Sequence, residues 1–297
     1  MEKDAGRAGS ATAPKAMGAS SEAIRRHYDL SDEFFQLWLD PGMVYSCALF
    51  DGSSDLAAAQ IRKLDHHIAA AGASGAARVL DIGCGWGSLL NRLVGHAGVA
   101  NAVGLTLSPS QAEWARGRAL PGVEVRQESW RDHRPVKPYD AIISIGAFEH
   151  FVHPGIGAAA KLDAYREFFA WCAKSLTPEG RLSLQTIAFT APPETTTRER
   201  MGFIEDSIFP ESELPLIWEP IAAAEGHFEL MALRNDGDHY YQTLRQWERN
   251  LAARRKEAVA LVGEPTFENV RHYLRVSAGA FKFRLICLLR MSFAKPL

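Results

Sequence analysis

A glycine-rich loop is the part of the sequence whose residue types point most directly to a chemistry. It reads D-I-G-C-G-W-G over residues 81–87, between a predicted strand (77–82) and a predicted helix (89–97). Glycines are needed where a backbone turns tightly and a ligand comes close to it. The N–H groups of such a loop, and the start of the helix after it, face the ligand. The loop therefore predicts a nucleoside-like ligand.

The spacing of these glycines argues against a dinucleotide cofactor. The dinucleotide fingerprint G-x-G-x-x-G has its third glycine one residue later, where this chain has Ser88. Dinucleotide enzymes also place an acid on the ribose about 20 residues further on. The next predicted strand instead ends G-L-T-L-S (104–108), without an acid. A nucleotide-dependent oxidoreductase is therefore disfavoured.

Gln111 has two competing interpretations. As part of a capping box, it would follow Ser108 at the N-cap and Pro109 at the first helical position. As a ligand-binding residue, its amide would reach the ribose hydroxyls in place of the missing acid. Position alone does not decide between the two.

Short apolar strands alternate with helices from residue 77 onward, which favours βαβ units and a parallel sheet. The predicted strands cover 77–82, 100–107, 123–127, 139–146, 181–189, 228–234 and 285–293. The predicted helices cover 21–40, 55–71, 89–97, 108–120, 162–176, 240–262 and 267–280. The proline-rich stretch 190–220 is expected to be an ordered loop with short helices.

Bulk properties are ordinary for a soluble globular protein. The 297 residues are 47% hydrophobic and 23% charged, with a net charge of −2, which argues against a standing nucleic-acid binder. No apolar run approaches the roughly 18 residues that span a bilayer. The small, polar first twenty residues predict a flexible tail rather than a secretory signal. The four cysteines are scattered, so we expect a cytoplasmic protein with reduced thiols and no metal.

Several separated motifs resemble those of one enzyme family. They are HYDLSDEFFQLWLDPGMVYSCALF (27–50), AAQIRKLD (58–65), VLDIGCGWGSL (79–89), GLTLSPSQ (104–111), ISIGAFEHF (143–151), SIFPES (207–212) and HYYQTLRQWERN (239–250). From about Ala23 to Ala294 the chain resembles the cyclopropane-fatty-acid synthase family, which includes the single-domain mycolic-acid cyclopropane synthases.

The resemblance implies a fold and a domain layout. The fold is an α/β class I methyltransferase (Rossmann-like) fold, a mostly parallel seven-stranded sheet with helices on both faces and a helical cover. The layout is a flexible tail over 1–20 and a single methyltransferase domain over 21–297. Within that domain, 21–75 form an N-terminal helical cover and 190–284 carry substrate-cover helices.

The resemblance also implies S-adenosylmethionine (SAM) as the co-substrate and assigns residues to it. Their shared task is to surround the methionine, ribose and adenine parts of SAM. They are Tyr45 and Ser46 at the methionine end, Asp81, Gly83 and Gly85 in the loop, Thr106, Leu107 and Gln111 near the ribose, Ser129 and Trp130 beside the adenine, and Ile145. This assignment raises the ligand-binding interpretation of Gln111 above the capping one.

In this family an alkene carbon attacks the sulfonium methyl, and the resulting carbocation loses a proton to a bound bicarbonate. The resemblance maps the residues around that base, with catalytic roles, to Cys47, Glu149, Gln185, Ile187 and Tyr240. The family's usual histidine is replaced by Gln185. Glutamine donates an amide hydrogen bond but cannot carry a titrating proton near neutral pH. We therefore expect altered deprotonation chemistry or a different acceptor.

Plainer roles stand beside these assignments. Glu149 could cap a helix, Tyr240 could be an ordinary half-buried tyrosine, and Cys47 could be a small apolar residue of the pocket. Ser207 and Glu211 depart from the family motif, which leaves the acceptor open.

Two acceptors are therefore weighed. The first is a lipid-like alkene, and the second is a small natural-product intermediate that undergoes C-methylation or cyclopropanation. A non-catalytic SAM-binding scaffold is the remaining alternative. No nucleic acid and no integral membrane segment are expected, and a homodimer is left open because the sequence does not fix the oligomeric state.

Overall fold

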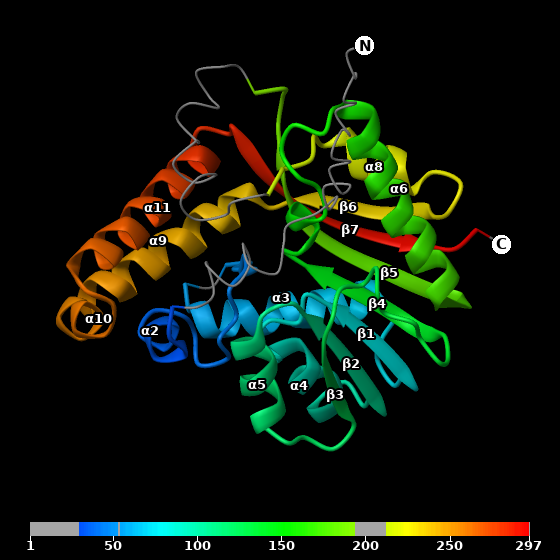
Figure 1. Cartoon of the computed structure of the whole chain (residues 1–297), viewed down its shortest axis with the longest axis horizontal. Helices are drawn as coiled ribbons and strands as arrows, with labels where there is room; N and C mark the ends of the chain where they lie inside the picture. Colours follow the sequence, from blue (N-terminus) through cyan, green and yellow to red (C-terminus); the bar gives the residue numbers. More distant parts are fainter. Residues whose placement is uncertain (1–29, 53, 194–211, 297) are drawn as a thin grey trace, which may run out of the picture.

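A seven-stranded sheet forms the centre of the computed structural model, which describes residues 30–52, 54–193 and 212–296 (Figure 1). The strands are β1 (Arg78–Ile82), β2 (Asn101–Thr106), β3 (Val123–Gln127), β4 (Tyr139–Ile145), β5 (Leu176–Phe189), β6 (Glu229–Asn235) and β7 (Ile286–Ala294). Their order is β3-β2-β1-β4-β5-β7-β6, and β7 runs antiparallel to both of its neighbours. This confirms the predicted mostly parallel sheet and places the last strand inside it.

Helices cover both faces of the sheet. On one face lie α3 (Leu56–Ala70), α4 (Ser88–Gly95) and α5 (Pro109–Gly117), which share a buried cluster containing Leu64, Leu90 and Ala112. On the other lie α6 (Ala158–Ser175) and α8 (Trp218–Ala224), whose cluster contains Phe168 and Ala223. Apolar side chains on alternate faces of the strands hold this three-layer arrangement together.

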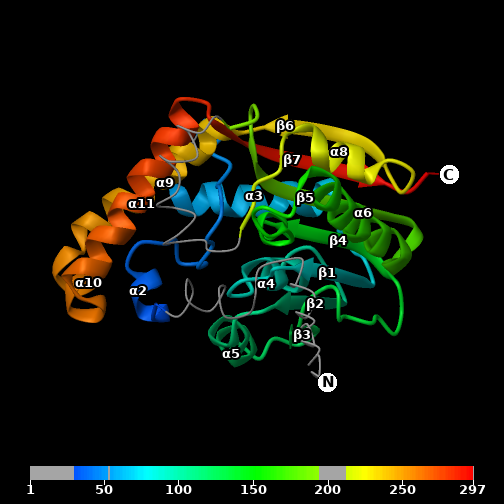
Figure 2. The same cartoon turned by 45° about the horizontal axis from the view of Figure 1, so that its top comes forward.

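A third cluster joins the cover helices. It combines α2 (Asp32–Gln36) with α9 (Gly237–Ala253), α10 (Arg255–Val262) and α11 (Glu264–Lys282). Trp38, Tyr45 and Trp247 pack against one another within it, with ring centroids 5.2–5.7 Å apart. Figures 1 and 2 show α9–α11 as an arm that extends beyond one end of the sheet. The predicted helical cover is therefore present.

The prediction of one helix over 21–40 is wrong for residues 30–40, the part that the structure describes. Ser31 has an extended backbone and caps a new helix, because its hydroxyl accepts from the N–H of Phe34. That helix ends at Gln36. A turn follows, in which the carboxylate of Asp40 accepts from the N–H groups of Gly42 and Val44. Asp40 thus shapes the chain just before Tyr45.

Other helices differ from the predicted ones in smaller ways. The predicted helix 240–262 is two helices, because Arg254 leaves the helical region at φ −105° and ψ 24°. Asp55 caps α3 as expected. In the stretch 190–220, helix α8 begins at Trp218. The predicted tail over 1–20, Ser207 and Glu211 lie outside the described residues.

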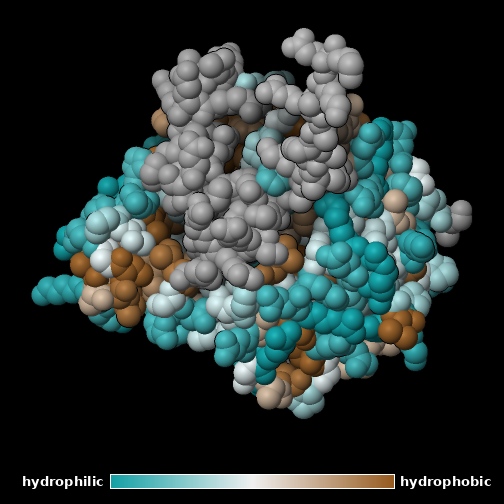
Figure 3. Space-filling view, in the orientation of Figure 1, coloured by the Kyte–Doolittle hydropathy of each residue, from teal (hydrophilic) through white to brown (hydrophobic). Residues whose placement is uncertain are grey.

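The described surface carries both polar and apolar regions. In Figure 3, hydrophilic residues cover much of the visible face, and apolar residues gather on the arm formed by α9–α11. Leu261 of α10 is 49% exposed there. Within residues 30–52, 54–193 and 212–296, every helix is too short or too polar to cross a bilayer.

Phe168 of α6 supplies a test of the packing. It is fully buried and contacts the rings of Trp130, Phe148 and Phe151. Phe168→Ala should lower the free energy of unfolding by about 3–5 kcal/mol, since it removes a ring and leaves a cavity. Urea unfolding measures this. Phe283, which is 73% exposed, is the matched control, and Phe283→Ala should change stability by less than about 0.5 kcal/mol. Equal losses would contradict the packing described.

Candidate active site

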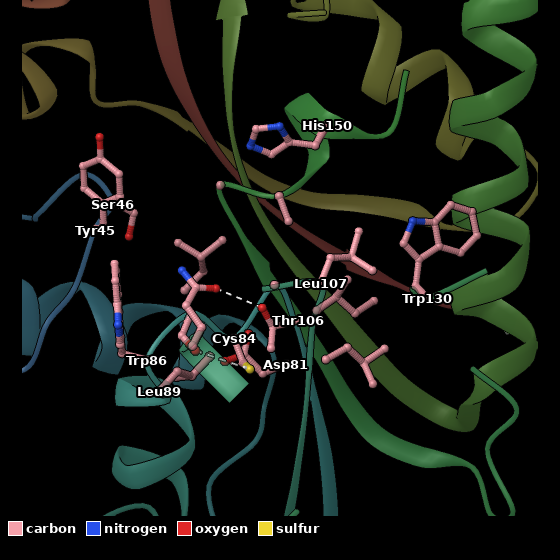
Figure 4. A pocket seen from close by; sticks show the side chains of 18 of the residues that line it. Tyr45, Ser46, Asp81, Cys84, Trp86, Leu89, Thr106, Leu107, Trp130 and His150 are labelled. Carbon is pink, nitrogen blue, oxygen red and sulfur yellow. Dashed lines mark hydrogen bonds between the residues drawn. The ribbon is translucent and has the colours of Figure 1, made fainter. Parts of the chain in front are cut away.

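A cavity of about 420 Å³ lies at the carboxyl ends of β1, β2 and β4. Ligands of open α/β sheets bind at such a crevice. Every residue predicted to bind SAM lines this cavity: Tyr45, Ser46, Asp81, Gly83, Gly85, Thr106, Leu107, Gln111, Ser129, Trp130 and Ile145. Figure 4 shows Tyr45 and Ser46 on one side of it and Trp130 on the opposite side. Residues from six separate segments are thus brought together.

The glycine loop lines the cavity with residues that carry no side chain, Gly83 and Gly85. Gly83 has φ +82°, and a Cβ on it would lie 2.6 Å from the Cβ of Ala147. Only glycine fits both this backbone conformation and this close approach. Gly87, with φ +83°, then opens α4 without a side-chain cap. The N–H groups at the start of that helix therefore have no capping side chain.

Gln111 combines the two predicted interpretations. The Ser108 hydroxyl accepts from the Gln111 N–H at 3.3 Å, so the helix cap exists. The Gln111 side chain, however, accepts a hydrogen bond from the Thr106 hydroxyl at 2.9 Å instead of reaching back to the Ser108 N–H (Figure 4). Thr106 itself accepts from that N–H at 3.2 Å. Because its side-chain oxygen is engaged, Gln111 offers its amide NH₂ to the cavity.

The remaining walls of the cavity are acidic at one point and aromatic at another. Asp81 is 2% exposed, and burial raises the pKa of its carboxyl to about 7 although Lys63 opposes this rise. Trp130 packs against Phe151 and Phe168, and the Arg131 guanidinium lies 4.5 Å from its ring centre. The flat wall suits a heteroaromatic ring, and the carboxyl suits a cation.

A second, smaller cavity of about 110 Å³ adjoins the first. Tyr45, Ser46, Gly146 and His150 line both cavities. The predicted catalytic residues Glu149, Gln185, Ile187 and Tyr240 also line the smaller cavity. The rest of its lining is mostly apolar residues from β5, β7, α9 and α11, together with Leu214 and the polar Ser212, Glu213 and Ser277. Two ligands, one in each cavity, would therefore meet at the shared wall.

Glu149 lines this second cavity and has one carboxyl oxygen without a hydrogen-bond partner. It lies in the short 3₁₀ helix η1 (Phe148–His150) that follows β4. Its Oε1 accepts from the Ile187 N–H at 2.7 Å, whereas its buried Oε2 has no hydrogen-bond partner among the described residues. Burial raises the pKa of Glu149 to about 7, although the Ile187 N–H and the Thr186 side chain oppose this rise. A buried oxygen without a partner costs about 1–3 kcal/mol, which a ligand that pairs with it would recover.

The orientation of the Gln185 side chain is fixed by two neighbours. Its Oε1 accepts from Arg290 Nε at 2.9 Å and from His67 Nε2 at 3.3 Å. Arginine has no acceptor, so the atom facing it must be the amide oxygen. Burial and Arg290 lower the pKa of His67 well below its usual value, so its ring is neutral and its Nδ1 accepts from Ser183 at 2.8 Å. The Gln185 NH₂ is thereby left for the cavity.

Cys47 lies outside the lining of the smaller cavity. It is fully buried, and its carbonyl oxygen accepts from Arg290 Nη2 at 3.2 Å. Arg290 also pairs with Asp236, so its charge is balanced within the protein. Tyr240 packs against Phe281, with ring centroids 4.6 Å apart, and lines the cavity as predicted.

Several polar residues around the cavities are absent from the predicted set: Gln60, Lys63, His67 and Arg290. Sequence signals for them exist. Positions 60, 63 and 67 share one helix face with the apolar Leu64, and polar residues on a buried face need a partner. Arg290 interrupts an apolar strand, which is costly unless its charge is paired.

Comparisons with known proteins identify one family over most of the chain. The family model described as mycolic acid cyclopropane synthetase matches residues 16–291. Cyclopropane mycolic acid synthase 2 of Mycobacterium leprae is 36% identical over 282 residues, which are 89% of this chain and 90% of that protein.

Two solved structures are similar over nearly the whole fold. The cyclopropane synthase MmaA2 of Mycobacterium tuberculosis is 32% identical with a TM-score of 0.85, covering 95% of this chain and all of that one. Mycolic acid cyclopropane synthase CmaA1, complexed with SAH (S-adenosylhomocysteine) and CTAB, is also 32% identical with a TM-score of 0.84 and the same coverage.

Gly83→Ala tests whether the loop must stay open. We expect SAH affinity to fall at least about tenfold, because the methyl group adds a collision with Ala147 to a strained backbone. Gly75→Ala is the matched control: Gly75 has a similar φ of +71° and open space around it. Calorimetric titration of both variants with SAH separates the two effects, because Gly75→Ala strains the backbone without creating a close contact. Equal affinities in the two variants would contradict the close approach.

Proposed function

Because the chain belongs to the mycolic acid cyclopropane synthetase family and is a SAM-dependent methyltransferase, we propose that it alkylates an alkene carbon of a lipid-like acceptor. The observation that carries this proposal is the pair of adjoining cavities. One is lined by the residues assigned to SAM, and the other is lined by Glu149, whose buried Oε2 has no hydrogen-bond partner among the described residues.

The larger cavity fits the parts of SAM. Gly83 and Gly85 leave room for the amino-acid chain, the NH₂ of Gln111 suits ribose hydroxyls, and Trp130 offers its ring to the adenine. Tyr45 and Ser46 belong to the wall shared with the smaller cavity. The reactive methyl group would therefore face the acceptor.

Bound SAM supplies an electrophilic methyl carbon, to which the alkene forms a new C–C bond as the C–S bond breaks and SAH leaves. The carbocation then left on the acceptor must lose a proton to a base. Loss from the transferred methyl closes a cyclopropane, and loss elsewhere leaves a methylated alkene. Tyr240 and Phe281 place aromatic rings at the smaller cavity, where each stabilises cationic charge by about 0.5–2 kcal/mol.

We further propose that the base is a bicarbonate held in the smaller cavity. Its oxygens would accept from the NH₂ of Gln185 and from a protonated Glu149 Oε2. Ile187 contributes by holding Glu149 Oε1 through its N–H. Cys47 contributes only indirectly, because its carbonyl is taken by Arg290.

The acceptor is proposed to be lipid-like because the smaller cavity is mainly apolar. Phe189, Leu244, Ile286 and Leu288 line it. The solved relative that carries SAH also carries CTAB, a lipid-like detergent.

Labelled SAM tests the proposed reaction. The enzyme would be incubated with SAM carrying a ¹³C methyl and with vesicles of cis-unsaturated phospholipid. We expect one labelled carbon on the acyl chain, detected by mass spectrometry. The same assay with small unsaturated acceptors tests the second candidate. Label found only on a small acceptor would contradict a lipid substrate, and label on no alkene would contradict the reaction.

Gln185→His restores the residue usual in the family. We predict that SAH affinity stays constant, because residue 185 lines only the smaller cavity, while turnover or the ratio of cyclopropane to methylated product changes. Imidazole can exchange a proton near neutral pH, whereas an amide cannot. Gln242→His, on the exposed side of α9, is the matched control. An unchanged rate and ratio in Gln185→His would sink the assignment.

The affinity of the enzyme for bicarbonate should depend on the protonation of Glu149. Its raised pKa of about 7 means that the neutral, donating form is present below about pH 7 and is lost above it. We therefore expect the bicarbonate affinity to fall by up to about tenfold per pH unit above that value. Glu149→Gln keeps a donor at every pH, so its profile should be flat. An affinity that rises with pH in the native enzyme would instead make the Glu149 carboxylate the base.

A further inference from the structure

Lys63 is a buried cation on the wall of the larger cavity. It lies in α3, is 1% exposed, and donates one hydrogen bond from Nζ to the Ser46 hydroxyl at 2.8 Å. No carboxylate of the described residues forms an ion pair with it, although Asp40 and Asp81 act on its charge from further away.

This arrangement is costly without an anion. A buried ammonium normally has a charged partner, because desolvation disfavours the charged form. Here burial, assisted by Arg290, lowers the pKa of Lys63 to about 7. The other cation on the cavity wall, Arg131, lies beside Trp130 and pairs with Glu167. Lys63 is therefore the cation of this wall that still needs a negative partner.

We propose that Lys63 binds the α-carboxylate of the methionine part of SAM and of SAH. The assignment rests on the proposed function, because it takes the larger cavity as the cofactor site. Lys63 holds Ser46, which belongs to the wall shared by the two cavities. The amino-acid end of the cofactor must lie near that wall for the sulfonium to face the acceptor.

Asp81 completes a site for a zwitterion. It is buried on the wall of the same cavity, and its charge interacts with that of Lys63. An α-amino acid carries an ammonium and a carboxylate on one carbon, so a buried acid and a buried lysine provide the matching charges. The Gln60 amide holds the Tyr45–Ser46 segment over this point by donating to the carbonyl oxygens of Val44 and Ser46, at 3.2 and 2.9 Å.

A purely structural role for Lys63 makes a different prediction. If Lys63 only held Ser46 in place, its loss would weaken every ligand of the cavity to the same degree. A ligand that lacks the carboxylate separates the two roles. The decarboxylated form of SAH keeps the nucleoside, the sulfur and the amine, and differs only in the group that Lys63 would bind.

The experiment is a thermodynamic cycle between this carboxylate and Lys63. Calorimetric titrations give the dissociation constants of SAH and decarboxylated SAH for the native enzyme, Lys63→Met and Lys63→Gln. We expect the native enzyme to prefer SAH by about 10–100-fold, the range of a hydrogen bond to a charged group. That preference should vanish in both variants. Arg131→Met removes the other cation of the wall, and this variant should still prefer SAH over decarboxylated SAH. Thermal melts check folding, and Lys63→Gln retains a donor for Ser46.

Two results would overturn the assignment. If the lysine variants lose affinity for both ligands by one common factor, Lys63 acts on the loop and not on the carboxylate, and the cofactor site stands. If the native enzyme binds neither ligand, the cofactor site itself is wrong, and the role of Lys63 falls with it.

Discussion

The site depends on a polar stripe along the buried face of α3. Gln60, Lys63 and His67 recur at helical spacing and are each at most 1% exposed. Buried polar groups must find hydrogen-bond partners. Gln60 and Lys63 find theirs in the Tyr45–Ser46 segment, and His67 finds its own on β5. One helix therefore ties the wall shared by both cavities to the strand that carries Gln185.

The sheet topology also helps to shape the site, because it places Arg290 beside Gln185. Because β7 lies between β5 and β6 and runs antiparallel to both, Arg290 stands directly opposite Gln185 in the ladder. Arg290 orients that amide, and Asp236, at the start of α9, balances its charge. Arg290 thus fixes which atoms of Gln185 remain for the smaller cavity. Two hydrogen bonds, from Arg290 and from His67, hold the side-chain oxygen of Gln185.

Local rules explain which features could be predicted from the sequence. The glycine loop, the caps at Asp55 and Ser108 and the strand alternation all depend on neighbours within a few residues. The break at Arg254 and the new helix start at Ser31 carry weaker local signals, and helical periodicity masked them. The contact between Gln185 and Arg290 joins residues 105 positions apart, so spacing alone cannot indicate it. The same holds for Lys63, whose buried position follows from how α3 packs against the loop and the sheet.

The most direct test of the account is a crystal structure of the enzyme grown with SAH and bicarbonate. We predict SAH in the larger cavity with its sulfur toward Tyr45 and Ser46. We also predict a planar anion in the smaller cavity, within hydrogen-bond distance of Glu149 Oε2 and the Gln185 amide nitrogen. A sulfur that points away from the smaller cavity, or SAH bound with no anion beside Glu149, would contradict it.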